Sequence, residues 1–218
     1  MTQAKNLTST RTLSLEGRRL LFIGAHMDDI ELGCGALMHS VAKRAEIRCV
    51  TLSDNRVDLP DDSLTAEHRA SLQILGVEAS NIDIYSFVTR RFSEARQDIL
   101  DRMIKLRDSY MPDVVFTHSG RDIHQDHEIA TGEVIRAFRG VTVLGFEILR
   151  STSGFVPNLF YEVSEVDALQ KVAALAQYQT YREKSYLGEG AVRSGLIRYG
   201  TIAEKPLAEA FDVMRLIS

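Results

Sequence analysis

The sequence predicts an α/β protein in which a mainly parallel central sheet lies between two layers of helices. Between residues 18 and 148, short apolar runs of strand length alternate with segments whose apolar residues recur every three or four positions. Gly, Pro and small polar residues separate these segments, as they do at the ends of strands and helices. Such an alternation is typical of a doubly wound sheet, because each helix connects two parallel strands.

The first half of the chain contains two strand–helix units and a third strand. Leu32, Leu37 and Val41 share one face of the first helix, and Gly76 ends the second. We expect, in order, a strand over 18–25, a helix over 31–45, a strand over 47–52, a helix over 63–75 and a strand over 82–87.

The second half repeats the pattern and then becomes less regular. Ser93 can cap a helix that carries Ile99 and Met103 on one face, and Gly140 ends the helix that follows the fourth strand. We expect, in order, a helix from Ser93, strand 113–117, helix 125–138, strand 141–148, loop 150–160, a helix from Ser164 to Tyr178, and a strand or short helix over 207–217.

Length and composition indicate one globular domain, 1–218, with residues 1–17 expected as a flexible N-terminal extension. Apolar residues make up 44% of the chain and charged residues 26%. The sequence has no apolar stretch of the about 18 residues that a membrane-spanning helix requires. Because the first residues lack the apolar segment of a secretory signal, we expect a cytoplasmic protein. A homo-oligomer is compatible with these features.

The cysteine content and the net charge exclude two further classes of protein. Cys34 and Cys49 are too few for a disulfide framework and form no CxxC pattern, so both are expected as buried thiols. The net charge is −4, and basic residues form no stripe interleaved with aromatic residues. Nucleic acid is therefore not an expected partner.

Two polar clusters follow two of the expected strands. His26, Asp28 and Asp29 come directly after the first strand, and His124-Gln125-Asp126-His127 follows the fourth. In a doubly wound sheet, ligands bind outside the carboxyl ends of the strands, where the strand order reverses between the first strand and the fourth. We therefore expect the two clusters to meet at that edge of the sheet.

The residue types in these clusters indicate a catalytic metal site. Imidazole and carboxylate groups bind zinc, and a catalytic zinc typically has three protein ligands and an open position for water. We expect His26, Asp29 and His127 to be these ligands. Asp28 is then free to act as the general base that takes a proton from the water and returns it to a leaving amine. Iron(II) or another divalent metal is compatible with the same ligands.

Further candidates lie in the second cluster and in the expected loops. His124 is expected to stabilise the developing oxyanion. Asp126 is expected to orient His124 and keep it charged, because a nearby carboxylate raises the pKa of an imidazole. Arg56, Arg91 and Arg121 lie near strand ends, where they can bind a phosphate or carboxylate of the substrate or remain solvated surface charges.

Residues later in the chain carry weaker signals. Glu147 and Arg150 follow the fifth expected strand and can line the same pocket. Tyr178, Tyr181 and Tyr186 are expected to pack on a helix face rather than to contact a sugar.

Simpler interpretations exist for the same residues. Asp28 or Asp29 can serve only as a helix N-cap, and His124 and His127 can be surface residues at the start of a helix. A non-catalytic metal- or nucleotide-binding module is therefore the alternative to an enzyme. A structural zinc site usually has four protein ligands, often thiols, whereas this set leaves one acid spare. The sequence contains neither the GxGxxG pattern of dinucleotide-binding proteins nor the GxSxG pattern of serine hydrolases.

The two clusters resemble the motifs of the LmbE-like (PIG-L) deacetylases. The first motif of that family, Ala-His-Pro-Asp-Asp followed by Ile-Glu and a small-residue turn, appears here over 25–35 as Ala-His-Met-Asp-Asp-Ile-Glu-Leu-Gly-Cys-Gly. The second motif, His-x-Asp-His, appears over 124–127. Met27 replaces the proline of the first motif, so the loop loses a residue of fixed φ.

The resemblance implies a Rossmann-like three-layer fold and a zinc-dependent N-deacetylase. Its substrate would be an N-acetylated amino sugar or an amino-sugar conjugate, with a nucleotide-linked sugar as one form. The resemblance implies the same ligands, His26, Asp29 and His127, with Asp28 as the base. The remaining residues, His124 and Asp126, would stabilise the transition state.

Overall fold

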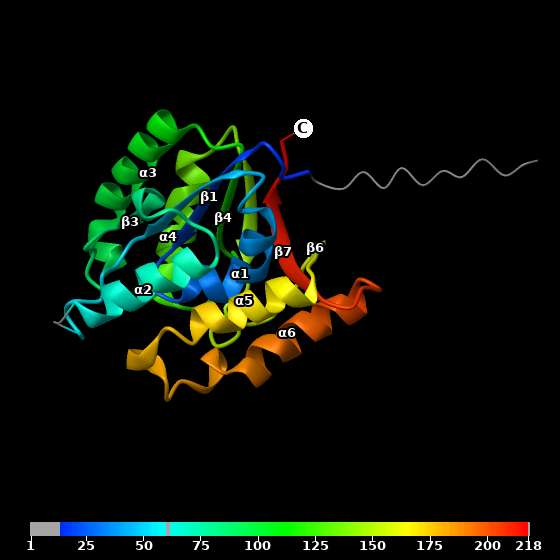
Figure 1. The fold of residues 1–218 in the computed structure, drawn as a ribbon. Helices are drawn as coiled ribbons and strands as arrows, with labels where there is room; N and C mark the ends of the chain where they lie inside the picture. Colours follow the sequence, from blue (N-terminus) through cyan, green and yellow to red (C-terminus); the bar gives the residue numbers. More distant parts are fainter. Residues whose placement is uncertain (1–13, 60–61, 218) are drawn as a thin grey trace, which may run out of the picture.

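A seven-stranded mixed sheet forms the centre of the protein (Figure 1). The computed structural model describes residues 14–59 and 62–217. The strand order is β3-β2-β1-β4-β5-β7-β6; β1 to β5 are parallel, and β7 is antiparallel to both of its neighbours. The strands are β1 (Arg19–Gly24), β2 (Glu46–Thr51), β3 (Ile82–Ile84), β4 (Val114–His118), β5 (Thr142–Phe146), β6 (Leu159–Glu162) and β7 (Ala208–Arg215).

Helices cover both faces of this sheet and complete the predicted three-layer α/β fold (Figure 1). On one face α3 packs against α4, and on the other α5 packs against both α1 and α2. The last helix, α6, contacts α5 and β7. The helices are α1 (Asp29–Val41), α2 (Ser63–Ile74), α3 (Arg96–Tyr110), α4 (Gln125–Ala137), α5 (Glu165–Leu175) and α6 (Glu189–Ile202).

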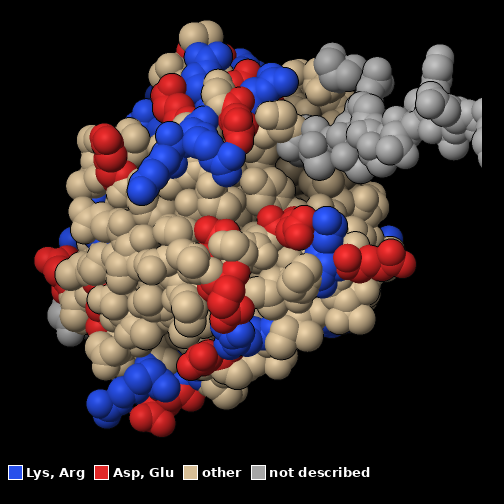
Figure 2. All heavy atoms as spheres, turned by 45° about the vertical axis from the view of Figure 1, so that its right-hand side comes forward, with Lys and Arg blue, Asp and Glu red and all other residues tan. Residues whose placement is uncertain are grey.

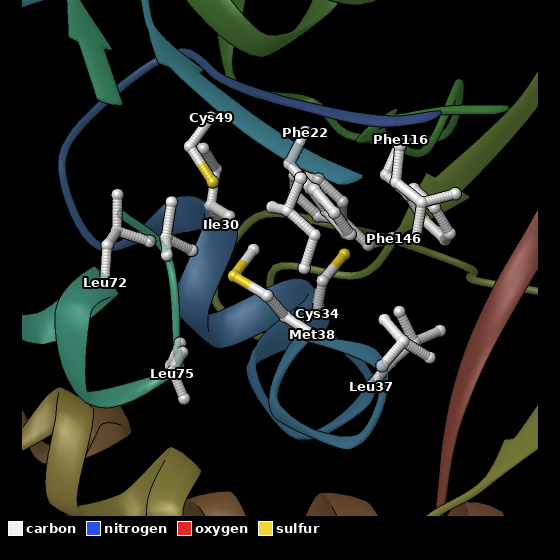
Figure 3. Close-up of a cluster of buried hydrophobic side chains, with 14 of the residues drawn as sticks. Phe22, Ile30, Cys34, Leu37, Met38, Cys49, Leu72, Leu75, Phe116 and Phe146 are labelled. Carbon is white, nitrogen blue, oxygen red and sulfur yellow. The ribbon is translucent and has the colours of Figure 1, made fainter. Parts of the chain in front are cut away.

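The main core lies between α1 and the sheet (Figure 3). Ile30, Cys34 and Met38 point from α1 toward the strands. The rings of Phe22 and Phe116 stack there, with their centroids 4.6 Å apart. Burying these side chains fixes α1 on the sheet, because each large apolar residue contributes about 1.5–3 kcal/mol when it leaves water. The N-terminus of α1 is thereby held at the carboxyl edge of β1.

Gly33 permits an unusually close approach of α1 to β5. A Cβ atom at this position would collide with the ring of Phe146. A glycine is therefore required at position 33 of the first motif, because a larger residue would not fit against Phe146. Cys34 and Cys49 are buried free thiols, as predicted.

The predicted strands and helices of the first 148 residues are present, with shifted ends. The strand expected over 82–87 is regular only over Ile82–Ile84, although the backbone N–H groups of Tyr85 and Phe87 still donate to the carbonyl groups of Thr51 and Leu52. The helix expected from Ser93 begins at Arg96, after a 3-10 turn over Phe92–Ala95. β1 lies beside β4, as the predicted strand order requires.

The C-terminal part differs more from the expectation. The expected loop 150–160 runs into the short edge strand β6, and the helix from Ser164 ends at Leu175 rather than Tyr178. The segment 207–217 contains the strand β7. Helix α6 was not predicted, because Gly190, Gly195 and Gly200 lower its helix propensity.

At the N-terminus, residues 1–13 of the expected extension lie outside the described residues. Leu15 belongs to the core, so the part of 1–17 that is described, from residue 14, contributes to the packed domain. Among the described residues, none of the helices is long and apolar enough to cross a membrane. Acidic and basic side chains are interspersed on the face shown in Figure 2.

Candidate metal centre

The two predicted clusters meet at the carboxyl edge of the sheet. Because β1 and β4 are parallel neighbours, the loops that follow them leave the same edge. Residues 26–29 follow β1, and residues 119–127 follow β4 and begin α4. Nδ1 of His26 consequently lies 3.1 Å from Nε2 of His127, although 101 positions separate the two residues.

The three predicted ligand atoms form a compact triangle. Nδ1 of His26 is 3.1 Å from Nε2 of His127 and 3.6 Å from Oδ2 of Asp29. The Asp29 oxygen is 3.5 Å from Nε2 of His127. Donor atoms bound at about 2.0–2.1 Å to a tetrahedral zinc lie about 3.3 Å from one another. The spacing therefore fits a single ion shared by all three residues.

Carboxylates behind the two imidazoles determine which ring nitrogens are free. Nε2 of His26 lies 2.9 Å from Oδ2 of Asp126, and Nδ1 of His127 lies 2.9 Å from Oδ2 of Asp122. Each of these nitrogens donates its proton to a carboxylate, so in the neutral imidazoles the lone pairs of the other two nitrogens face each other. Two opposed lone pairs at 3.1 Å require a positive charge between them. The donor set thus fits a divalent metal.

The raised pKa of His26 also indicates that a positive charge is favoured between the two rings. Burial, the largest effect, lowers this pKa, but hydrogen bonds to Asp126 and Asp29 outweigh it and raise the pKa to about 10. A proton on Nδ1 of His26 can then donate to Nε2 of His127 when no metal is bound. A metal ion and this proton would compete for the same place.

His118 and His124 also lie close enough to His127 to share a metal ion with it. Their hydrogen bonds, however, already engage one nitrogen of each ring. Nε2 of the buried His118 accepts the backbone N–H of Ala25 at 3.0 Å, so its lone pair is already used. Nδ1 of His118 has no hydrogen-bond partner among the described residues. Nδ1 of His124 accepts the backbone N–H of Asp126 at 3.2 Å, which leaves the proton on Nε2. In this state Nε2 of His124 is a hydrogen-bond donor.

Asp28 is buried beside the triangle and lines the cleft over it. It occupies the N-cap position of α1, but its side chain makes no capping hydrogen bond. Its φ of 101° places it in the left-handed region, which costs energy for a residue other than glycine. Burial and then the charge of Asp29 raise the pKa of Asp28 well above its usual range. A carboxylate with a raised pKa is suited to take up a proton.

The prediction for Asp126 needs correction. Its carboxylate accepts from His26 and from the backbone N–H groups of Arg90, at 2.6 Å, and Phe92. These donors come from the loop before α3, which turns the carboxylate toward His26 instead of the ring of His124. The pKa of His124 is lowered, by burial and then by His127 and His26, so the predicted charged imidazole is not supported.

A cleft of about 680 Å³ opens over the triangle. Arg56, Arg91 and Arg121 do not line it, so their predicted contact with substrate is not supported. Arg56 and Arg91 are turned outward by ion pairs with neighbouring acids on the surface. The charged residues outside the ligand triangle that line the cleft are Asp28, Asp58, Arg90, Arg150 and Lys184. Glu147 lines a separate small cavity.

One wall of the cleft comes from the segment 176–188, which sequence reasoning did not connect with the site. Tyr178 packs in the core as predicted, and its hydroxyl lies 2.6 Å from both Oε1 of Glu31 and Nδ1 of His68. Tyr181 and Tyr186, which were expected only to pack, line the cleft. The anchored Tyr178 thus holds the segment beside the candidate metal centre.

Lys184 in this segment contacts the predicted base. Its Nζ lies 3.9 Å from Oδ2 of Asp28, and the hydroxyl of Tyr186 lies 3.4 Å from the same oxygen. The ammonium group also lies over the ring of Tyr181, 3.0 Å from the centroid. Neither a motif nor a periodicity points to Lys184 in the sequence. Asp122, by contrast, lies two residues before His124, and this position next to the second motif could have indicated a role in the site.

The fold and the site together define an α/β protein with a His/Asp centre at the switch point of its sheet. The family model of PIG-L, described as GlcNAc-PI de-N-acetylase, matches residues 21–138. The chain therefore belongs to the PIG-L family, as the motifs predicted. The match covers both polar clusters, all of β4 and most of β1.

Individual relatives agree with this assignment. The chain is 29% identical over 169 residues to the uncharacterized deacetylase YaiS of Escherichia coli, covering 74% of this chain and 90% of YaiS. The N,N'-diacetylchitobiose deacetylase of Pyrococcus horikoshii superposes with a TM-score of 0.71 at 18% identity, over 90% of this chain and 84% of that one.

The same fold is also found in a protein with another reaction. GalB of Pseudomonas putida, a 4-carboxy-2-hydroxymuconate hydratase, superposes with a TM-score of 0.72 at 19% identity, over 92% of this chain and 98% of GalB. At this level of identity the likeness shows the fold alone. The reaction has to be argued from the site.

Proposed function

We propose that this protein is a zinc-dependent N-deacetylase that removes the acetyl group from an N-acetylated amino sugar or amino-sugar conjugate. The observation that carries the proposal is the opposed pair of imidazole nitrogens of His26 and His127, with Asp29 completing the set and the spare acid Asp28 beside it. Family membership and the names of the relatives support the acetamide as the group attacked.

His26, Asp29 and His127 would hold the metal. When bound, zinc would supply a Lewis acid that polarises the acetamide carbonyl and lowers the pKa of water to about 7. Asp28 takes a proton from the attacking water as the bond to the carbonyl carbon forms. His124 lines the cleft, and its Nε2–H group donates to the developing oxyanion.

Asp28 then completes the reaction by returning its proton to the nitrogen of the substrate. The bond between the carbonyl carbon and the nitrogen breaks, and acetate and a primary amine leave. Because Asp28 is buried and its pKa is raised, it holds a proton readily between these two steps. Lys184 and Tyr186 keep its carboxylate directed into the cleft.

The test is to incubate zinc-loaded protein with a panel of N-acetylhexosamines and their nucleotide-linked forms. We expect equal amounts of primary amine and acetate to appear, and chelation of the metal to abolish both. Tight metal binding without release of amine from any member of the panel would instead support the alternative, a non-catalytic metal- or nucleotide-binding module.

A further inference from the structure

Arg150 is a cation in the cleft that has no anionic partner among residues 14–59 and 62–217. It follows β5, lines the cleft and is exposed to solvent. Within the described part of the chain, no carboxylate lies within 4.0 Å of its guanidinium group. The other arginine of the cleft, Arg90, is neutralised by Asp58, with Nη2 and Oδ1 2.6 Å apart. Arg150 therefore offers free charge to a ligand of the cleft.

Two side chains connect Arg150 with the predicted base. The guanidinium carbon lies 6.0 Å from the centroid of the Tyr186 ring, and the hydroxyl of Tyr186 lies 3.4 Å from Oδ2 of Asp28. The Nζ atom of Lys184 lies 5.7 Å from the same ring centroid. Arg150 and Lys184 thus stand around one tyrosine on one wall of the cleft.

These two cations repel each other, and Asp28 is the one acid among the described residues that lies within 4.0 Å of either. An anion held between them would remove this repulsion. Arginine is suited to such a role because its planar donors match the oxygen atoms of phosphate and carboxylate. Tyr186 adds a rigid surface next to the same place.

We propose that Arg150, with Lys184 beside it, is an anion subsite that makes the enzyme select amino sugars carrying a phosphate or carboxylate group. Arg150 is a specificity-determining residue. It contacts the part of the substrate away from the acetamide, whereas Asp28 and the metal act on the acetamide. The inference rests on the proposed function, since it assigns the group that accompanies the amino sugar in the same cleft.

The experiment compares kcat/KM of zinc-loaded protein for N-acetylglucosamine, its 1-phosphate, its 6-phosphate and 2-acetamido-2-deoxyglucuronic acid. We expect one of the anionic sugars to exceed the neutral sugar at least about tenfold, and the better arm identifies phosphate or carboxylate. Arg150→Ala should reduce this ratio about tenfold or more. Arg150→Lys should recover part of it, because lysine keeps the charge but loses the planar pair of donors.

Arg139→Ala is the matched control. Arg139 is an exposed arginine beyond the C-terminal end of α4, so it lies at the opposite edge of the sheet, and its substitution should leave the ratio unchanged. Equal ratios in the wild type and Arg150→Ala would overturn the inference. So would a wild type that hydrolyses the neutral sugar as well as every anionic one.

A binding measurement separates this inference from the proposed function. Titration of glucosamine 6-phosphate, glucosamine 1-phosphate, 2-amino-2-deoxyglucuronic acid and glucosamine into the zinc-loaded protein, followed by calorimetry, requires no turnover. Tighter binding of one of the anionic sugars than of glucosamine, lost in Arg150→Ala, would support the subsite even if no acetamide is hydrolysed. Hydrolysis of N-acetyl sugars without any Arg150-dependent binding would support the function and reject the subsite.

Discussion

His26 and His127 direct ring nitrogens at each other across 3.1 Å, while a carboxylate binds the opposite nitrogen of each ring. The two rings come from segments 101 positions apart, which the parallel neighbours β1 and β4 bring to one edge of the sheet. Asp126 and Asp122 fix the rotation and the tautomer of the imidazoles, and a positive charge is needed between the rings.

Binding of zinc should release a proton from this pair. Hydrogen bonds raise the pKa of His26 to about 10, so without metal the ring is protonated below that pH, whereas a ligand must be neutral. The apparent affinity should therefore rise about tenfold per pH unit through neutral pH, until other ligand protons or hydroxide intervene. Calorimetry in buffers of different ionisation enthalpy measures the protons released. A pH-independent affinity and no proton release would contradict this account.

Asp126→Asn should weaken zinc binding about 10- to 100-fold, because the carboxylate behind His26 raises the basicity of its ligand nitrogen. Competition with a fluorescent chelator measures the affinity. If Asp126 instead acted on His124, as first expected, turnover would fall at unchanged zinc affinity. Gln125→Ala is the neighbouring control, since the side chain of Gln125 donates to the backbone carbonyl of Arg90 and not to a ligand imidazole.

Asp28→Asn should leave zinc bound and slow hydrolysis by about two orders of magnitude or more, the usual contribution of a positioned base. Asparagine has a similar shape, so it keeps the contact with Tyr186 but cannot accept the proton from water. Metal analysis and kcat are measured on the same sample. Wild-type turnover in this variant would remove Asp28 from the mechanism.

His124→Ala should lower kcat, while the zinc content stays that of the wild type. The reason is the hydrogen bond from the backbone of Asp126 to Nδ1, which leaves Nε2 as a donor. His127→Ala, tested in parallel, should lose metal and activity together. Loss of zinc in His124→Ala would show that the alternative set, His26, His124 and His127, is the one that binds.

Lys171→Met should destabilise the protein by about 3–5 kcal/mol, because it leaves the buried carboxylate of Glu209 unpaired. Nζ of Lys171 lies 2.6 Å from Oε1 of Glu209, whose oxygens also accept backbone N–H groups of α1. Unfolding by urea measures the change. Lys205→Met removes an exposed pair with Glu162 and should cost less than about 1 kcal/mol. Equal effects in the two variants would contradict the expected role of burial.

The part of the site that depends on local sequence was predictable. Residues 26–29 follow a strand, the second motif begins a helix after another strand, and parallel neighbours place both at one edge. The same reasoning failed for Asp126, whose partner is chosen by the loop before α3, and for the three arginines, which face solvent. Lys184 gave no signal, since a core tyrosine far from any motif holds its segment in place.

The sequence alone determined the alternation of strands and helices, the place of the two clusters at strand ends and the residue types suited to a metal. These features follow from hydrophobic periodicity and short-range motifs, which act between near neighbours in the chain. Only the tertiary structure decided which nitrogen of each imidazole faces the centre and which cations line the cleft. Those choices depend on hydrogen bonds and burial between residues as far apart as His26 and Asp126, or Asp28 and Lys184, and no local pattern encodes them.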